Sequence, residues 1–214
     1  MLLRLPIELR LKVYALVLGA CPCRNPHAFY AHQHRIALNI LLVNRQIYTE
    51  TRILGFRLHR FGFHRWCGTG VHVCRIFLQR LRRWQLCSMQ KLSLRAVESC
   101  LVNGYGSDQS NSEWFDICTM LAAAVESNCV GVRELSLTIE GHLTDGGLKL
   151  LDTDAEWVQL GLGSLKCLRR LELVIASDTI QTGVAETFKS SLIDAFSGIQ
   201  VAMKVVMGGK EISL

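Results

Sequence analysis

Five residues of the types that bind zinc lie close together near the N-terminus: Cys21, Cys23, His27, His32 and His34. Thiolate and imidazole are the usual zinc ligands, and structural sites commonly pair their cysteines as Cys-x2-Cys. Here a single residue separates the two cysteines, and a single residue separates the last two histidines, which crowds the ligands onto neighbouring positions. The spacing favours a polar surface segment with two free thiols. We therefore predict no metal site and no cofactor.

The sequence lacks the motifs of common enzyme chemistry. It contains no GxGxxG, no Walker-type phosphate loop, no GxSxG and no HExxH. Gly161 and Gly163 form a Gly-x-Gly pair without the other residues of a phosphate loop. Asp152 and Asp154 precede a helical pattern, where acids complement the helix dipole. We therefore expect no catalytic residues and a protein that is not an enzyme.

Arginines are concentrated in a stretch that could contact phosphate groups, since residues 51–97 contain no acid. The candidate nucleic-acid-binding residues are Arg75, Arg80, Arg82 and Arg83. Trp84 could add an aromatic plane for base stacking. However, Ile76, Phe77, Leu81 and Trp84 would share one face of a helix, which favours a buried Trp84 with arginines at its solvated rim. Nucleic-acid binding is therefore the alternative function.

The two halves of the chain carry opposite net charge. Residues 1–97 hold 16 lysines and arginines against two acids, a net charge of +14. Residues 98–214 hold 8 lysines and arginines against 16 acids, a net charge of −8. This asymmetry indicates two functional parts, the first of which suits an acidic partner surface.

Cysteine content and hydropathy predict an intracellular protein, cytoplasmic or nuclear. The nine cysteines are an odd number, and most lie singly within apolar patterns, which predicts buried free thiols. Residues 18–21 resemble a lipoprotein cleavage box, but Glu8, Arg10 and Lys12 interrupt the apolar core that an export signal needs. No apolar run approaches the roughly 18 to 20 residues that cross a bilayer. We expect no membrane association.

Two helices are predicted in the N-terminal part. The first covers Leu5–Leu18, with Pro6 at the first helical position, apolar residues at helical spacing and Gly19 at its end. The second covers about Ala37–Leu54 and ends at Gly55. Residues 55–70 then form a short strand or an extended connection.

Helical and extended segments alternate from residue 71 onward. Short strands are predicted over residues 89–94, 132–137, 168–173 and 201–207, and the final helix over 182–196. Capping boxes are predicted at Ser110 with Glu113 and at Thr153 with Glu156. Such units favour parallel strands with helices packed on one side. The first three strands recur at intervals of 43 and 36 residues, longer than the roughly 20 to 29 of a leucine-rich repeat, which indicates irregular, degenerate repeat-like units.

The predicted fold class is α+β, with two parts. Residues 1–70 form a small helical module, and residues 71–214 form leucine-rich-repeat-like helix–strand units with a short, mostly parallel sheet. Two motifs of the first part, LRLPIELRLKVY at residues 3–14 and LLVNRQIYxE at residues 41–50, resemble the F-box-like module of filamentous fungi. The second of these motifs is the more specific.

The F-box-like resemblance implies a function. In F-box proteins the Leu-Pro helix docks on the small acidic adaptor subunit of a cullin-type ubiquitin ligase, and a following repeat domain holds the substrate. The resemblance implies a non-enzymatic protein-interaction module with an adaptor subunit and a substrate as partners. The partner-binding residues would be Leu5, Pro6, Leu9 and Val13. The alternative interpretation is that the apolar residues among them form the core of a helical domain.

Overall fold

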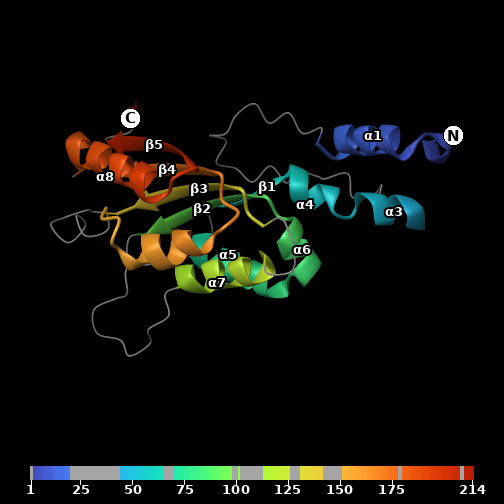
Figure 1. Ribbon diagram of the computed structural model, residues 1–214, viewed down its shortest axis with the longest axis horizontal. Coiled ribbons are helices and arrows are strands. Elements are labelled where there is room, and N and C mark those ends of the chain that lie inside the picture. The colour runs from blue at the N-terminus through green and yellow to red at the C-terminus, as the bar shows by residue number, and fades with distance from the viewer. Residues whose placement is uncertain are drawn as a thin grey trace.

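The protein has a mixed α/β fold built on one six-stranded sheet (Figure 1). The computed structural model describes residues 2–19, 44–64, 70–97, 101, 113–125, 131–141, 151–177, 180–207 and 210–214. The strands are β1 (Arg60–Phe63), β2 (Lys91–Val97), β3 (Glu134–Glu140), β4 (Arg170–Ala176), β5 (Gln200–Met207) and β6 (Lys210–Ser213). Their order in the sheet is their order in the chain. The first five strands are parallel and β6 is antiparallel to β5, which confirms the predicted mostly parallel sheet.

One or two helices precede each of the strands β2 to β5. They are α5 (Gly70–Arg80), α6 (Arg83–Ser88), α7 (Glu113–Val125), the short π-helix η4 (Trp157–Gly161), the 3-10 turn η5 (Leu162–Ser164) and α8 (Thr182–Ala195). Trp114 of α7 packs edge-on against Trp157 of η4, and Trp157 packs against Phe188 of α8. Because these contacts link the helices in series, the helices form one layer, as predicted.

The register of the parallel strands explains why the helices cover one face. Leu92 of β2 pairs with Leu135, which pairs with Leu171 and then with Val201 of β5. Successive residues of a strand point to opposite faces, so this row and the two rows that follow it at alternate positions build a continuous apolar surface. Apart from the half-buried Val201, these residues belong to the same buried core as the inward faces of α5, α7 and α8. The repeated leucine spacing in the sequence is thus the core face of the sheet.

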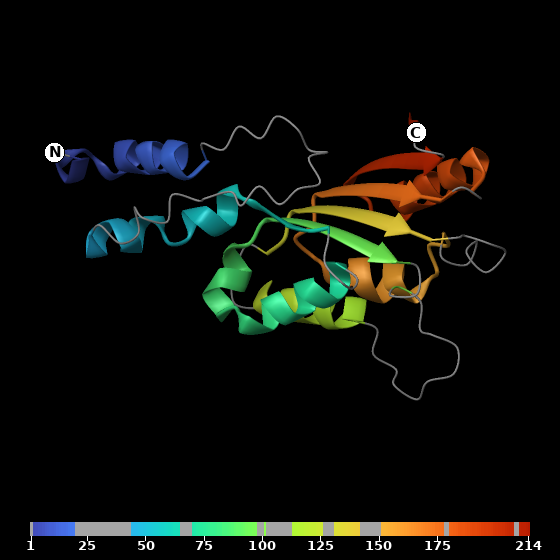
Figure 2. The ribbon, with the colours of Figure 1, turned by 180° about the vertical axis from the view of Figure 1, so that it is seen from behind.

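The helices of the N-terminal part lie beyond the β1 edge of the sheet (Figures 1 and 2). They are the 3-10 turn η1 (Leu2–Arg4), α1 (Ile7–Gly19), α3 (Arg45–Thr51) and α4 (Leu54–Leu58). The first predicted helix is confirmed with a start at Ile7 in place of Leu5. Strand β1 pairs with β2, so the sheet extends across the predicted division at residue 70.

The second predicted helix, about Ala37–Leu54, is not one continuous helix. Asn44 is extended, and its side-chain oxygen accepts the Gln46 N–H at 2.7 Å, so it caps a helix that begins at Arg45. That helix ends at Thr51, and Gly55 lies inside the next helix, α4, instead of ending one. Residues 37–43 lie outside the described part of the chain.

The helix predicted from Val71 through Trp84 is also two helices. The chain turns at Leu81, Arg82 is extended, and α6 begins at Arg83. The buried residues of α5 are Gly70, Val71, Cys74 and Leu78, so the core stripe is rotated from the predicted one. Trp84 is half-buried and lies outside the main core.

The predicted capping box at Thr153 does not cap η4. Thr153 lies in a turn, and its backbone carbonyl accepts the side-chain N–H of Gln159 at 2.9 Å. Helix η4 begins later, at Trp157, without a side-chain cap. The Asp152 carboxylate accepts the N–H of Asp154 at 3.1 Å, a local turn contact. Ser110, the other predicted cap, lies outside the described residues.

Candidate protein-docking surface on the N-terminal helices

Helix α1 packs on α3 and α4 through one narrow face. Arg10, Tyr14 and Leu18 recur every four residues along that face and are all buried. Ile47 and Thr51 are the buried residues of α3. Since residues four apart lie above one another on a helix, this set leaves most of the circumference of α1 outside the contact.

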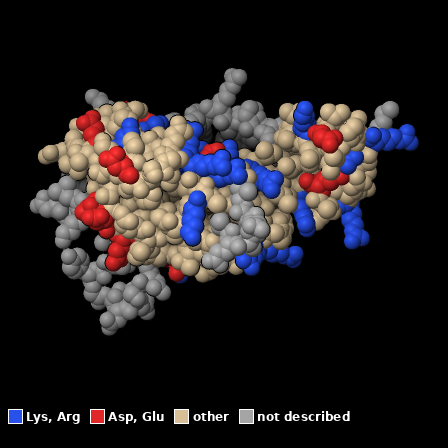
Figure 3. All heavy atoms as spheres, in the orientation of Figure 1, with Lys and Arg blue, Asp and Glu red and all other residues tan. Residues whose placement is uncertain are grey.

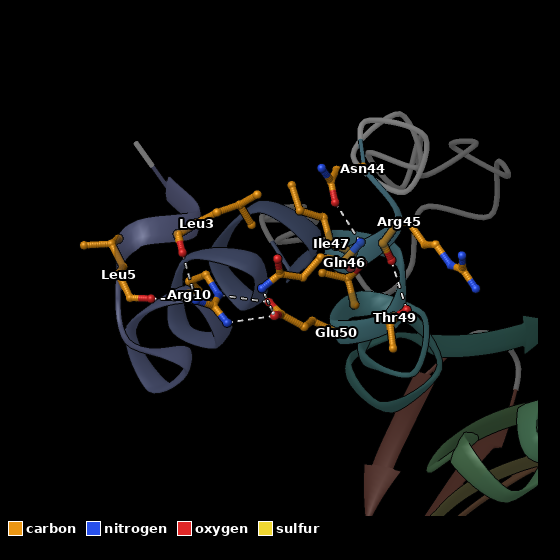
Figure 4. Close-up of polar contacts among 10 residues, drawn as sticks. Leu3, Leu5, Arg10, Asn44, Arg45, Gln46, Ile47, Thr49 and Glu50 are labelled. Atoms are coloured by element: carbon orange, nitrogen blue, oxygen red, sulfur yellow. Dashed lines mark hydrogen bonds and ion pairs between the residues drawn. The ribbon is translucent and has the colours of Figure 1, made fainter.

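Arg10 is the polar centre of the packed face (Figure 4). Its Nε and Nη2 donate to the two carboxylate oxygens of Glu50 in α3, at 3.1 and 2.7 Å. Its Nη1 donates to the backbone carbonyls of Leu3 at 3.2 Å and Leu5 at 2.6 Å. Gln46 also donates to Glu50, at 2.9 Å. A bidentate Arg–carboxylate pair of this kind fixes orientation as well as distance.

The hydrogen bonds from Arg10 and Gln46 lower the pKa of the Glu50 carboxyl below its ordinary value of 4.5. A group with a depressed pKa in the folded state contributes stability that is complete above its unfolded pKa and is lost as the pH falls through its folded pKa. We expect the free energy of unfolding of the wild type to fall more steeply below about pH 4.5 than that of Glu50→Gln. Urea titrations between pH 7 and 3 measure both slopes, and parallel curves would contradict the expectation.

The flank of α1 beside its packed face is apolar and largely exposed. Leu9, Val13 and Leu16 follow one another at helical spacing there; Leu9 and Leu16 are 46% and 73% exposed, and Val13 is half-buried. We call these three residues the α1 ridge. Of the other predicted partner-binding residues, Leu5 and Pro6 are exposed just before the helix. The structure therefore leaves Leu5, Pro6 and Leu9 outside the core.

Leu16 is the member of the ridge that sequence reasoning did not single out. It is the most exposed of the large apolar residues in the described part of the chain. The sequence does contain an indication of its role. Leu16 follows Leu9 by seven residues and Val13 by three, and this spacing places the three side chains on one face of an α-helix. A row of exposed apolar side chains on a helix marks an interaction site more often than scattered ones do.

Helix α4 and the first strand connect the N-terminal helices to the sheet through aromatic contacts. Phe56 of α4 stacks on Phe61 of β1 with ring centroids 5.5 Å apart, and it meets the edge of Trp84 at 5.7 Å. The Arg52 guanidinium lies 5.3 Å from the centre of the Trp84 ring, a cation–π contact. Trp84 is therefore a structural contact between the two parts of the molecule.

The four arginines predicted to bind nucleic acid do not form one free cluster. Arg75 contacts Glu113 at 3.3 Å and Asp116 at 3.1 Å on α7, which neutralises its charge locally. Arg80, Arg82 and Arg83 are exposed around the turn between α5 and α6.

The thiols of the described residues are structural. Cys74, Cys87 and Cys118 are buried thiols, as predicted, whereas Cys167 is half-buried. Burial raises the pKa of Cys74 and Cys118, which keeps both thiols protonated and unreactive. The part of the chain that the structure describes holds no group of three or more His, Cys, Asp or Glu side chains placed to bind a metal. The Cys21–His34 set lies outside it.

The sheet face away from the helices is polar. Its side chains alternate with the core leucines along β2 to β5; Ser136 and Thr138 are half-buried there, and Ser93 is buried. Charged groups pair across the strands: Arg60 lies 3.6 Å from Glu134 and 3.7 Å from Glu172, and further pairs join Lys91 to Glu134, Arg95 to Glu140 and Lys204 to Glu211. Within the described residues, the helices leave this face open. We call it the open sheet face.

Comparison with protein-family models, curated proteins and solved structures found no match to this chain. None of the described helices is both long and apolar enough to span a bilayer. A function therefore has to be inferred from the exposed surfaces and their charges.

Proposed function

We propose that the protein is a non-enzymatic, F-box-like adaptor. Its N-terminal helices would dock on the small acidic adaptor subunit of a cullin-type ubiquitin ligase, and its leucine-rich-repeat-like units would hold a substrate protein. The observation that carries the proposal is the α1 ridge: an apolar row on the helix of the Leu-Pro motif that faces away from the protein's own core.

Charge supports an acidic partner for the α1 ridge. Arg4 and Lys12 are exposed beside the apolar row, and residues 1–97 carry a net charge of +14. In Figure 3, Lys and Arg gather over the middle of the visible face and around the end with α1 and α3, while most Asp and Glu lie at the opposite end. An acidic surface would be attracted to the end of the molecule that presents the apolar row.

The open sheet face supports a second, separate binding role. Its acidic side chains Glu134, Glu140 and Glu172 each pair with a basic side chain of another strand, so the face offers balanced charge and hydroxyl groups to a partner. Exposed pairs of this kind exchange partners at little cost. A protein segment of mixed charge fits such a surface better than a polyanion does.

A binding measurement with two probes tests the proposal. The full chain is expected to bind the purified acidic adaptor subunit with micromolar or tighter affinity by calorimetry, and to keep binding when Arg80, Arg82 and Arg83 are all replaced by glutamine. The second probe is a DNA or RNA oligonucleotide. Binding to it with a steep salt dependence, reduced by the triple replacement, would support the nucleic-acid alternative instead, since each lost phosphate contact removes about one released counterion.

A further inference from the structure

The turn that precedes α1 is held by a side chain of α1 itself. Arg10 is 9% exposed, and its guanidinium donates in two directions: to the Glu50 carboxylate in α3 and to the carbonyls of Leu3 and Leu5. The second direction reaches Leu3 in η1 and Leu5, the residue between η1 and Pro6. One buried cation thus ties the N-terminal turn, α1 and α3 together (Figure 4).

Two leucines of the turn have exposed side chains, whereas their backbone carbonyls accept hydrogen bonds from Arg10. Leu3 and Leu5 are each 38% exposed, although their backbone oxygens accept from the buried guanidinium. The Leu5 N–H also donates to the carbonyl of Leu2 at 3.1 Å, which closes η1. The backbone is therefore fixed from the inside, and the two leucines are presented to solvent in a defined orientation.

We propose that Arg10 is a positioning residue that holds η1 as a second apolar edge of the docking surface, with Leu3 and Leu5 completing the α1 ridge. This inference rests on the proposed docking function and deepens it. Without the guanidinium, the three-residue turn η1 would fray, because so short a segment is not stable alone. An ordered edge binds with less loss of conformational entropy than a frayed one.

The chemistry requires arginine at this position. Its planar fork carries five donors, enough for a bidentate carboxylate contact and two carbonyls at once. The compact ammonium of lysine cannot span both directions. Arg10→Lys should therefore keep much of the attraction to Glu50 and lose the contacts to Leu3 and Leu5.

A charge exchange separates the two roles of Arg10. In Arg10→Glu/Glu50→Arg the ion pair between α1 and α3 can form again with unchanged net charge, but residue 10 no longer donates to the Leu3 and Leu5 carbonyls. We expect the double variant to recover most of the melting temperature lost by either single variant. It should still show faster amide hydrogen exchange at Leu5 and an affinity for the acidic adaptor subunit at least about tenfold below wild type.

The outcomes decide between the possibilities. Wild-type affinity and wild-type exchange at Leu5 in the double variant would overturn the inference, because the ion pair alone would then be sufficient. Fast exchange at Leu5 with unchanged affinity would overturn the part that places Leu3 and Leu5 in the docking surface. If the wild-type chain itself does not bind the adaptor subunit, the proposed function fails, while exchange at Leu5 still decides whether Arg10 orders the turn.

Discussion

Replacing Leu9 and Leu16 by aspartate is expected to weaken binding of the acidic adaptor subunit by at least about 100-fold while leaving the fold intact. Both side chains belong to the α1 ridge and face away from the protein's own core. In a complex, each carboxylate would lose its water in an apolar contact without a partner, which typically costs several kcal/mol. Calorimetry on the full chain measures the loss.

Leu160→Asp is the matched control. Leu160 is 64% exposed on η4, in the layer of helices on the sheet, so the change adds one carboxylate, where the ridge variant adds two, to a leucine of comparable exposure outside the proposed surface. We expect unchanged affinity for the control and unchanged circular dichroism for both proteins. Equal affinity of the ridge variant and the control would contradict docking through α1. Unfolding of the ridge variant would show that Leu9 and Leu16 are core residues.

Gly161→Ala is expected to produce a large loss of stability, about 3 kcal/mol. A Cβ atom at this position would lie 2.1 Å from Nε1 of Trp114. The indole is completely buried and donates to the carbonyl of Trp157 at 3.0 Å, so it cannot swing away without losing that hydrogen bond and disturbing the core. Urea denaturation followed by tryptophan fluorescence gives the free energy of unfolding.

Gly163→Ala, two residues further on, serves as the comparison. A Cβ there would meet only the Val158 carbonyl oxygen, at the ordinary contact distance of 3.8 Å. We expect a change within about 0.5 kcal/mol, as for most substitutions that create no clash. Similar losses for the two glycine variants would mean that the helix backbone, and not the close approach of Trp114, requires glycine at residue 161.

The sheet was predictable because its signal is local. Strand residues such as Leu135 and Leu137 alternate with polar ones, and the same pattern in β4 places Leu171 and Leu173 beside them. A row of buried leucines results wherever the pattern recurs in parallel strands. The start of α3 does not follow from periodicity, because the apolar spacing runs through Asn44, where the chain is extended and the side chain caps the helix.

The proposed docking surface was only partly predictable because α1 is apolar on nearly all sides. Periodicity indicates which face of a helix is buried only when the other face is polar. Here the buried face contains an arginine, while Leu16 is left in solvent. The reason is Glu50, which lies 40 residues away in the sequence and neutralises Arg10 in the fold. No local pattern reports such a pair.

The role of the Gly-x-Gly pair at residues 161 and 163 could not be predicted from local sequence patterns either. The sequence offers no phosphate-loop residues around it, which excluded one role but suggested no other. The reason for the first glycine is Trp114, 47 residues earlier in the chain, whose indole occupies the space that a side chain would need. Such close approaches follow from how elements pack and are visible only once the fold is known.

The order of the strands has a consequence for how the chain acquires its structure. Each of the first five strands pairs only with its neighbours in the sequence, and paired residues are between 30 and 43 positions apart. Parallel sheets often need contacts between distant parts of a chain, which slows folding because a long loop must close first. Here no strand needs a partner from the far end of the sequence in order to pair. The sheet can nucleate in any one unit and grow outward by adding the next, as repeat proteins do.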